Sequence, residues 1–227
     1  IEVMYIDVGA MNREEVHEMG ITIGTTITWR GEPVELANNF VATAAADDRA
    51  GLAAIISVAK ELKDNPIPST VYYIGTVEEE IGLRGAEVAT YGLDVDIAFA
   101  IDTCPAGYQP DVPSVDIFYE VGKGPCMQIG ETGSRGIKFG SELLRKWLMD
   151  VANKNKIPYQ TGIMYGGTDA SAMQQTMSGL HAMAFSIPRR YSHSPVEVLS
   201  MEDLNNLIRI LSEAIPGVDS GFNQHRV

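Results

Sequence analysis

The stretch VYYIGTVEEEIGLRGA, residues 71–86, carries the clearest information about the fold. Its first part is rich in β-branched and aromatic residues, which predicts a buried strand over 71–77. Three consecutive carboxylates follow at 78–80, with Gly82 and Gly85 close behind them. An acidic run of this kind is usually a solvated loop. In open α/β sheets, however, ligands lie outside the carboxyl ends of the strands, so these carboxylates are also candidates for a functional site.

The composition narrows the class of protein. Of the 227 residues, 45% are hydrophobic and 21% are charged, which is typical of a globular protein with a sizeable core. The formal net charge of -13 argues against nucleic acids and anionic membranes as partners, because both attract clustered Lys and Arg. No apolar run approaches the roughly 18 residues of a membrane span and no basic-then-apolar leader is visible, so we expect a cytoplasmic protein. Cys104 and Cys126 are too few for a disulfide framework and are expected to be buried thiols.

From residue 47 onward, segments with helix and strand patterns alternate along the chain. In DDRAGLAAIISVAKELKDN, residues 47–65, apolar residues recur at helical spacing. The alternation predicts an α/β fold with a mostly parallel central sheet flanked by helices, and an antiparallel edge strand is compatible with it. The expected elements are a strand at 1–9, a helix capped by Asn12 and ended by Gly20, β-segments within 21–44, a helix at 47–65, strands at 71–77 and 96–102, a β-rich segment at 114–130, a helix at 137–155, a strand at 159–165, a helix at 169–177, a strand at 181–188 and a helix at 201–215 capped by Ser200.

Acidic residues and a histidine stand at the ends of several predicted strands. Asp47 stands at a predicted strand-to-helix junction, Asp102 ends the apolar run IAFAID, and His193 follows a third strand. Together with Glu79 and Glu80, these side chains are expected at one edge of the sheet. Converging carboxylates repel one another unless one is protonated or a divalent cation binds. A histidine with carboxylates and no thiolate is a ligand set suited to Zn, Co or Mn.

Single members of this set also have structural interpretations. Asp47 or its neighbour Asp48 is suited to cap the following helix by accepting amide hydrogen bonds. His193 stands between two serines, which is typical of an exposed turn. Asp102 ends an apolar strand, so its charge is expected to be partly desolvated and to need a partner. These alternatives stay open for single residues, whereas the set as a whole favours a metal site.

Several motifs together resemble one enzyme family. The order of ADDRAG, TVEEEIGLRGA, FAIDT and RRYSHSPVE is similar to that in the glutamyl, deblocking and tetrahedral aminopeptidases, which are cocatalytic dimetal exopeptidases. YGGTDASAM at 165–173 and IPYQ at 157–160 are also similar to this family, in which some relatives are labelled endoglucanase. The resemblance extends from Ile1 to about Val218 and implies a zinc-exopeptidase-like fold.

The resemblance also implies roles for individual residues. Asp47 would bridge two metal ions, and Glu80 and His193 would complete the first site. Asp102 would bind the second ion, and Glu79 would be the general base that acts on a metal-activated water. The implied activity is that of a metal-dependent aminopeptidase that removes N-terminal residues from short peptides. The implied cofactors are divalent ions, Zn or Co, with two per full-length family subunit and one as an alternative for this chain.

The sequence departs from the family pattern at its start. Relatives carry an N-terminal His-x-Asp segment whose histidine completes the second metal site, and no His-x-Asp occurs in these 227 residues. We therefore expect a fragment of the family's protein. Its expected parts are the tail of a β-rich insert and oligomerisation domain at 1–43, a catalytic domain at 44–218 and a tail at 219–227. A homo-oligomer, from dimer to dodecamer, is implied by the resemblance.

Two other functions stay open beside the aminopeptidase. The missing His-x-Asp favours a truncated, non-catalytic metal-binding or assembly subunit. A glycoside hydrolase with Glu79 and Asp102 as its acid and base is a third possibility, because carboxylate pairs serve that chemistry. The run GGTDAS is suited to cap a helix. Two arginines that stand close in sequence to the acidic run and to His193 are suited to bind a substrate carboxylate or to pair with the acidic cluster. The residues whose roles stay open are Thr168, Asp169, Arg84 and Arg190.

Overall fold

The computed structural model describes residues 5–65, 67–110, 112–113, 115–133, 136–219 and 222. The chain divides into two compact units, Ile1–Arg30 and Gly31–Val227. The predicted domain boundary near residue 43 is not tested by this division and stays a prediction.

The first unit contains one short helix, α1 (Arg13–Glu18), within its described residues. The Asn12 side chain accepts a hydrogen bond from Glu15 N at 3.0 Å, and the Glu15 carboxylate accepts from Met11 N at 2.8 Å. These reciprocal bonds cap the helix, as its sequence predicts. The strand expected at 1–9 is not formed by residues 5–9, and residues 1–4 lie outside the described residues.

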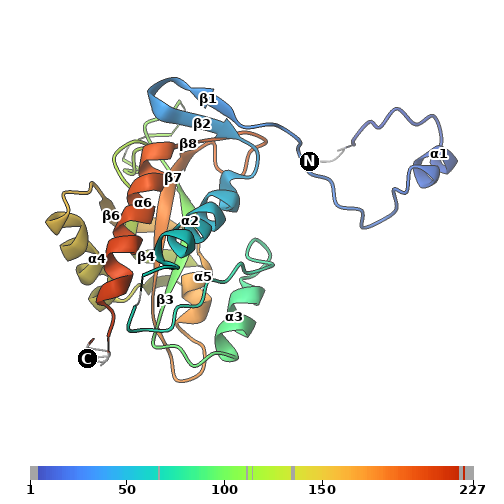
Figure 1. The fold of residues 1–227 in the computed structure, drawn as a ribbon. Coiled ribbons are helices and arrows are strands. Elements are labelled where there is room, and N and C mark those ends of the chain that lie inside the picture. Colours follow the sequence, from blue (N-terminus) through green and yellow to red (C-terminus); the bar gives the residue numbers. More distant parts are fainter. Residues whose placement is uncertain are drawn as a thin grey trace. The chain divides into compact units, whose positions relative to one another are not determined.

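The second unit is built on one sheet (Figure 1). Its strands are β1 (Val34–Leu36), β2 (Phe40–Thr43), β3 (Ile97–Pro105), β4 (Cys126–Gly133), β5 (Gly136–Phe139), β6 (Gln160–Tyr165), β7 (His181–Arg190) and β8 (Glu197–Ser200). They run in the order β1-β2-β8-β7-β4-β5, while β3 pairs with β7 and β6 pairs with β4. The longest ladder, β3 with β7, is parallel, and so is β4 with β6.

The predicted α/β sheet flanked by helices is confirmed, but its strands are mixed in direction rather than mostly parallel. The pairs β1–β2, β2–β8, β7–β8, β4–β5 and β4–β7 are antiparallel. Short connections cause much of this, because strands joined by a few residues fold back as hairpins. Residues 37–39 join β1 to β2, and residues 191–196 join β7 to β8.

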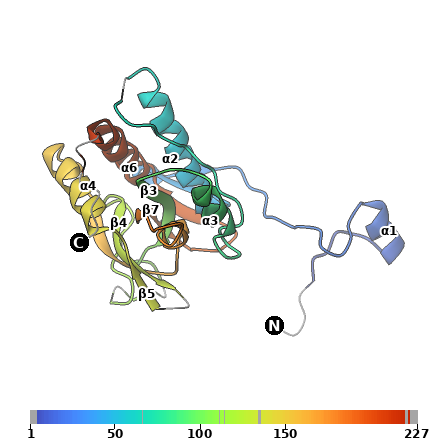
Figure 2. The ribbon, with the colours of Figure 1, turned by 90° about the horizontal axis from the view of Figure 1, so that it is seen from below.

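Helices cover both faces of the sheet, as Figures 1 and 2 show. They are α2 (Ala46–Leu62), α3 (Arg84–Tyr91), α4 (Glu142–Lys154), α5 (Asp169–Met173) and α6 (Met201–Ala214). Side chains of β7 alternate between two cores. Met183, Phe185 and Ile187 pack with α2, α4 and α6, whereas Ala182 and Ala184 pack with α3 and α5. The alternation along β7 therefore fixes which helices lie on which face.

Two of the predicted helices, at 47–65 and 201–215, are confirmed as α2 and α6. The helix predicted at 137–155 begins only at Glu142, because the residues before it form β5 and Ser141 caps the helix. The sequence patterns did not predict the short helix α3 or the strand β8.

The strand predicted at 71–77 is wrong. These residues form no strand, and Tyr72 and Tyr73 are 50% and 40% exposed. A strand needs a hydrogen-bonded neighbour, and none of the strands in the described ranges pairs with this segment. The segment still leads the chain to the three carboxylates at 78–80.

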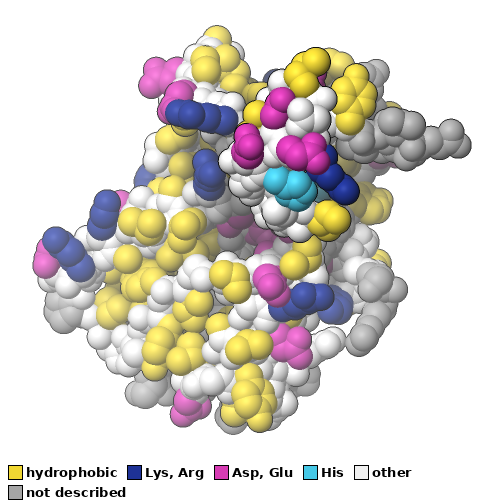
Figure 3. Space-filling model, turned by 90° about the vertical axis from the view of Figure 1, so that its right-hand side faces the viewer, with side chains coloured by type: hydrophobic (Ala, Val, Ile, Leu, Met, Phe, Trp, Pro, Cys, Tyr) yellow, Lys and Arg dark blue, Asp and Glu magenta, His cyan; other side chains and the backbone are white. Residues whose placement is uncertain are grey.

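The surface of the molecule carries apolar and charged side chains side by side. On the face drawn in Figure 3, hydrophobic groups lie among acidic and basic ones. None of the helices in the described part of the chain combines the length and the apolarity that a bilayer span requires.

Candidate metal centre

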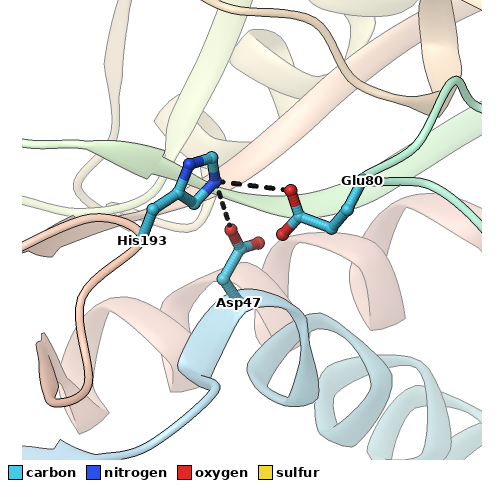
Figure 4. Close-up of side chains that lie close together, drawn as sticks. All are labelled: Asp47, Glu80 and His193. Atoms are coloured by element: carbon cyan, nitrogen blue, oxygen red, sulfur yellow. Dashed lines mark ion pairs between the residues drawn. The ribbon is translucent and has the colours of Figure 1, made fainter. Parts of the chain in front are cut away.

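Three side chains from distant parts of the sequence meet at one point (Figure 4). Asp47 comes from the start of α2, Glu80 from the loop before α3, and His193 from the loop between β7 and β8. The Nε2 atom of His193 lies 3.1 Å from Asp47 Oδ2 and 3.5 Å from Glu80 Oε2. One ligand atom of each residue lies within 4.8 Å of the other two. The structure therefore brings together the residues expected at the first metal site.

The two aspartates at the start of α2 have different partners. Asp48 Oδ1 accepts a hydrogen bond from Gly51 N at 2.9 Å, which is the contact of a helix cap. The Asp47 carboxylate instead accepts from Thr103 Oγ1 at 3.0 Å and faces His193. Because Asp48 supplies the cap, the carboxylate of Asp47 is left to face the site.

A second group of carboxylates shares Asp47. Ligand atoms of Asp47, Asp48 and Asp102 also lie within 4.8 Å of one another. Asp102 is buried on β3 and accepts a hydrogen bond from Thr103 N at 2.6 Å. The structure places Asp102 beside Asp47, as expected for the second site, and adds Asp48, for which the sequence predicts only a capping role.

A buried ion-pair network supports these residues from behind. Arg189, near the end of β7, pairs with Asp47 Oδ2 and with Glu197 Oε1, the latter at 2.7 Å from its Nε. Glu197 on β8 also accepts hydrogen bonds from Asp47 N and His193 N, each at 3.0 Å. The side chains of Arg189 and Glu197 are each 2% exposed. Glu197 therefore links the backbone of two candidate metal ligands to one buried arginine.

Burial and neighbouring negative charges raise the pKa values of three carboxylates in the centre. Burial raises the pKa of Asp48 to about 8, and the charge of Asp47 adds to this shift. Burial also raises the pKa of Asp102 well above its usual range, with further contributions from Asp48 and Asp47. Burial and the Asp47 charge raise the pKa of Glu80 in the same way. A bound divalent cation would relieve this repulsion.

Glu79 stands next to the ligand group without being part of it. Burial raises its pKa to about 7, and Asp169, Glu80, Asp47 and Glu131 add to the shift. A carboxylate that titrates near neutrality is suited to accept and return a proton at physiological pH. Its environment is therefore compatible with the predicted role of general base.

Glycine at position 85 allows the chain to turn tightly behind this glutamate. Gly85 N donates to Val77 O at 3.0 Å, and a Cβ at Gly85 would lie only 2.3 Å from the same oxygen. Gly82 has a φ of +127°, which side-chain-bearing residues rarely adopt. The two glycines that follow the acidic run thus allow a positive φ and a close backbone contact that residues with a Cβ would disfavour.

The residues whose roles the sequence left open lie outside the ligand groups. Thr168 caps α5, since its Oγ1 accepts from Ala170 N at 3.2 Å. Arg84 pairs with Glu78 at 3.5 Å on the surface. Arg190 lies over the ring of Phe40, with 5.4 Å from its guanidinium carbon to the ring centre.

Arg189, Glu197 and Glu131 are buried charged residues that the sequence patterns did not single out. Glu197 carries the one signal that was available, because it lies inside the β-rich run VEVLS, where a charged side chain facing the core needs a partner. Its partner is eight residues away, on another strand, and spacing alone does not reveal the contact.

An α/β sheet that gathers a histidine and several carboxylates at one site is typical of metal-dependent hydrolases. The family model for M42 glutamyl aminopeptidase matches residues 1–210. This chain belongs to that family, and the resemblance seen in its motifs is confirmed.

Individual relatives agree with this assignment. The lysyl aminopeptidase of Pyrococcus furiosus is 37% identical over 207 residues, which cover 90% of this chain and 57% of the relative. An aminopeptidase structure from Desulfurococcus kamchatkensis matches with a TM-score of 0.85 and 36% identity, over 93% of this chain and 58% of that one. The TET1 peptidase of Pyrococcus horikoshii matches with a TM-score of 0.76 and 31% identity, over 92% and 59%. This chain thus spans less than two thirds of each of these proteins.

Proposed function

We propose that this chain is the catalytic part of a metal-dependent aminopeptidase that removes N-terminal residues from short peptides. The observation that carries the proposal is the convergence of Asp47, Glu80 and His193, next to Glu79, which belongs to neither ligand group. Family membership supports the same reaction class.

The spacing of the first ligand group fits a divalent ion. Two ligand atoms held tetrahedrally at about 2.1 Å from one ion lie about 3.4 Å apart. The distances from His193 Nε2 to the Asp47 and Glu80 oxygens are 3.1 and 3.5 Å. A histidine with two carboxylates suits Zn or Co, and we propose either of these as the native ion.

Each residue has a defined role in this proposal. Asp47, Glu80 and His193 would hold the first ion, and Asp47 with Asp102 would hold a second. Such ions, when bound, lower the pKa of water and polarise a carbonyl group. Glu79 would take the proton from the water that attacks the scissile carbonyl carbon and deliver it to the leaving amine.

One observation favours the non-catalytic alternative. The second group contains three carboxylates and, among the described residues, no histidine. A second ion would therefore be held less completely than the first, and a metal-binding subunit without turnover is our second candidate function.

We also propose a homo-oligomer, since the TET1 peptidase of Pyrococcus horikoshii assembles into a tetrahedron or a large octahedral shell. The predicted division into domains at 1–43 and 44–218 and the cytoplasmic location belong to the same proposal.

Metal content by elemental analysis, with hydrolysis of an aminoacyl-p-nitroanilide panel before and after chelation, tests the function. We expect bound metal and chelator-sensitive release of nitroaniline. Glu79→Gln should keep the metal and lose activity, whereas His193→Ala should lose both. Bound metal without turnover would instead support the non-catalytic subunit, and chelator-resistant cleavage of a glycoside would support the glycosidase.

A further inference from the structure

One serine is buried on β7 without a hydrogen-bond partner. Ser186 is fully buried, and its Oγ neither donates to nor accepts from any residue in the described ranges. A hydroxyl group left in this way costs free energy, and such atoms in folded proteins call for an explanation. The side chains on either side of Ser186 decide what this hydroxyl group can bind.

The pairing of the strands places Ser186 beside Asp102. In the parallel ladder of β3 and β7, Asp102 is the register partner of Ser186. Both side chains lie on the same face of the sheet, because Ala100 and Ala184, two residues before them, share one core cluster. Neighbouring strands lie about 4.8 Å apart, and a serine hydroxyl group moves among three positions by one rotation. Such a rotation brings the Ser186 hydroxyl group within hydrogen-bond reach of the Asp102 carboxylate.

Asp102 is the stronger of the two acceptors beside Ser186. On the other side, the register partner of Ser186 is Cys126 on β4, whose buried thiol is a weak acceptor. Hydrogen bonds to a carboxylate are stronger, because the acceptor is charged. An ionised carboxylate has about four acceptor positions, and the bond from Thr103 N to Asp102 Oδ1 uses one of them. Positions therefore remain for a serine hydroxyl group and for a metal ion.

We propose that Ser186 is a positioning residue for Asp102. When Asp102 serves as a ligand, the Ser186 hydroxyl group rotates to donate to its carboxylate and fixes the orientation in which that carboxylate binds the ion. The inference rests on the proposed function and deepens it, since partners of this kind hold metal ligands in place. Arg189, three residues further along β7, pairs with Asp47. Strand β7 would thus orient both aspartates that hold the second ion.

Calorimetric titration of Co²⁺ into the purified, chelator-treated chain tests the proposal. We expect two binding steps, and Asp102→Asn identifies the second step as the one that it weakens. Ser186→Ala should weaken the same step by about 10- to 100-fold and leave the first step unchanged. Ser57→Ala is the control, because it removes an exposed hydroxyl group on α2 and should change neither step.

Two further measurements separate the hydroxyl group from the packing of the side chain. Because Ser186 Oγ has no partner in the fold, Ser186→Ala should leave the midpoint of urea unfolding in chelator unchanged or raise it. Ser186→Thr keeps a hydroxyl group at this position and should therefore retain the second ion. A weaker second step without any loss of stability is a result that a merely structural serine would not produce.

The proposal is overturned if Ser186→Ala binds the second ion as tightly as the wild type, or if Ser186→Thr loses it to the same extent as Ser186→Ala. It is equally overturned if the wild-type chain binds fewer than two ions. Chelator-sensitive hydrolysis together with one of these results would leave the peptidase function standing and refute only the role of Ser186. Conversely, a second step that depends on Ser186 without any turnover would support the positioning role and favour the non-catalytic subunit.

Discussion

Glu197→Gln probes whether the buried network positions the candidate metal ligands. The glutamate accepts from Arg189 Nε, Asp47 N and His193 N, at 2.7, 3.0 and 3.0 Å. Removing one partner of a buried ion pair costs about 3–5 kcal/mol, because the other charge is left uncompensated. Arg189 keeps its contact with Asp47, so we expect the lower end, about 3 kcal/mol of unfolding free energy.

The same change should also weaken metal binding. A glutamine has one acceptor oxygen where the glutamate has two, so at least one of the two backbone amides loses its bond and the two ligands are held less firmly. Losing a group that orients metal ligands typically costs about 10- to 100-fold in metal affinity. The two effects are separable, because stability can be measured in chelator and affinity on the folded chain.

Urea unfolding in chelator, followed by circular dichroism, measures the first effect, and competition with a chromophoric chelator measures the second. Glu213→Gln is a matched control, since this exposed residue lies in the last turn of α6 and should shift stability by no more than about 0.5 kcal/mol. If Glu197→Gln unfolds at the wild-type urea concentration, the buried pair does not stabilise the fold as argued. An unchanged metal affinity would refute the positioning role.

Three further outcomes follow from the structure. Burial raises the pKa of Asp203 to about 6, so the folded chain binds this proton more tightly than the unfolded chain does. About 3 kcal/mol of unfolding free energy is therefore present below pH 4 and is lost as the pH rises through about 6. In urea unfolding at pH 4 to 7, Asp203→Asn should lack this loss, in contrast to the wild type. Gly85→Ala should lower the unfolding free energy by about 1–3 kcal/mol and weaken metal binding, because the new Cβ would lie 2.3 Å from Val77 O. Gly92→Ala is the control and should have a small effect on stability, because the nearest atom to its Cβ would be 3.9 Å away. An unchanged melting curve for Gly85→Ala would contradict the close approach. Chelation should lower stability by about 2.7 kcal/mol if free metal stood at 100 times its Kd, and His193→Ala should show no such difference in a thermal melt.

The sequence patterns predict an element correctly where the spacing of its apolar residues is enough to identify it. Helix α2 and helix α6, with its Ser200 cap, follow from apolar spacing and an N-cap residue. The strand at 71–77 was wrong because its apolar run says nothing about whether a neighbouring strand is present to pair with it. Helix α3 was missed because Gly85 disfavours a helix, and only the contact with Val77 explains the glycine.

The candidate site divides in the same way. Asp47 and His193 adjoin predicted elements that the structure forms, the helix α2 and the strand β7, whereas Glu80 was expected at the end of a strand that the structure does not form. The ion pair of Arg189 and Glu197 could not be predicted, because it depends on the register in which β7 and β8 pair, and the sequence patterns do not reveal that register. Asp169 shows the limit most clearly, since a capping run such as GGTDAS gives no sign that one carboxylate oxygen stays unpaired.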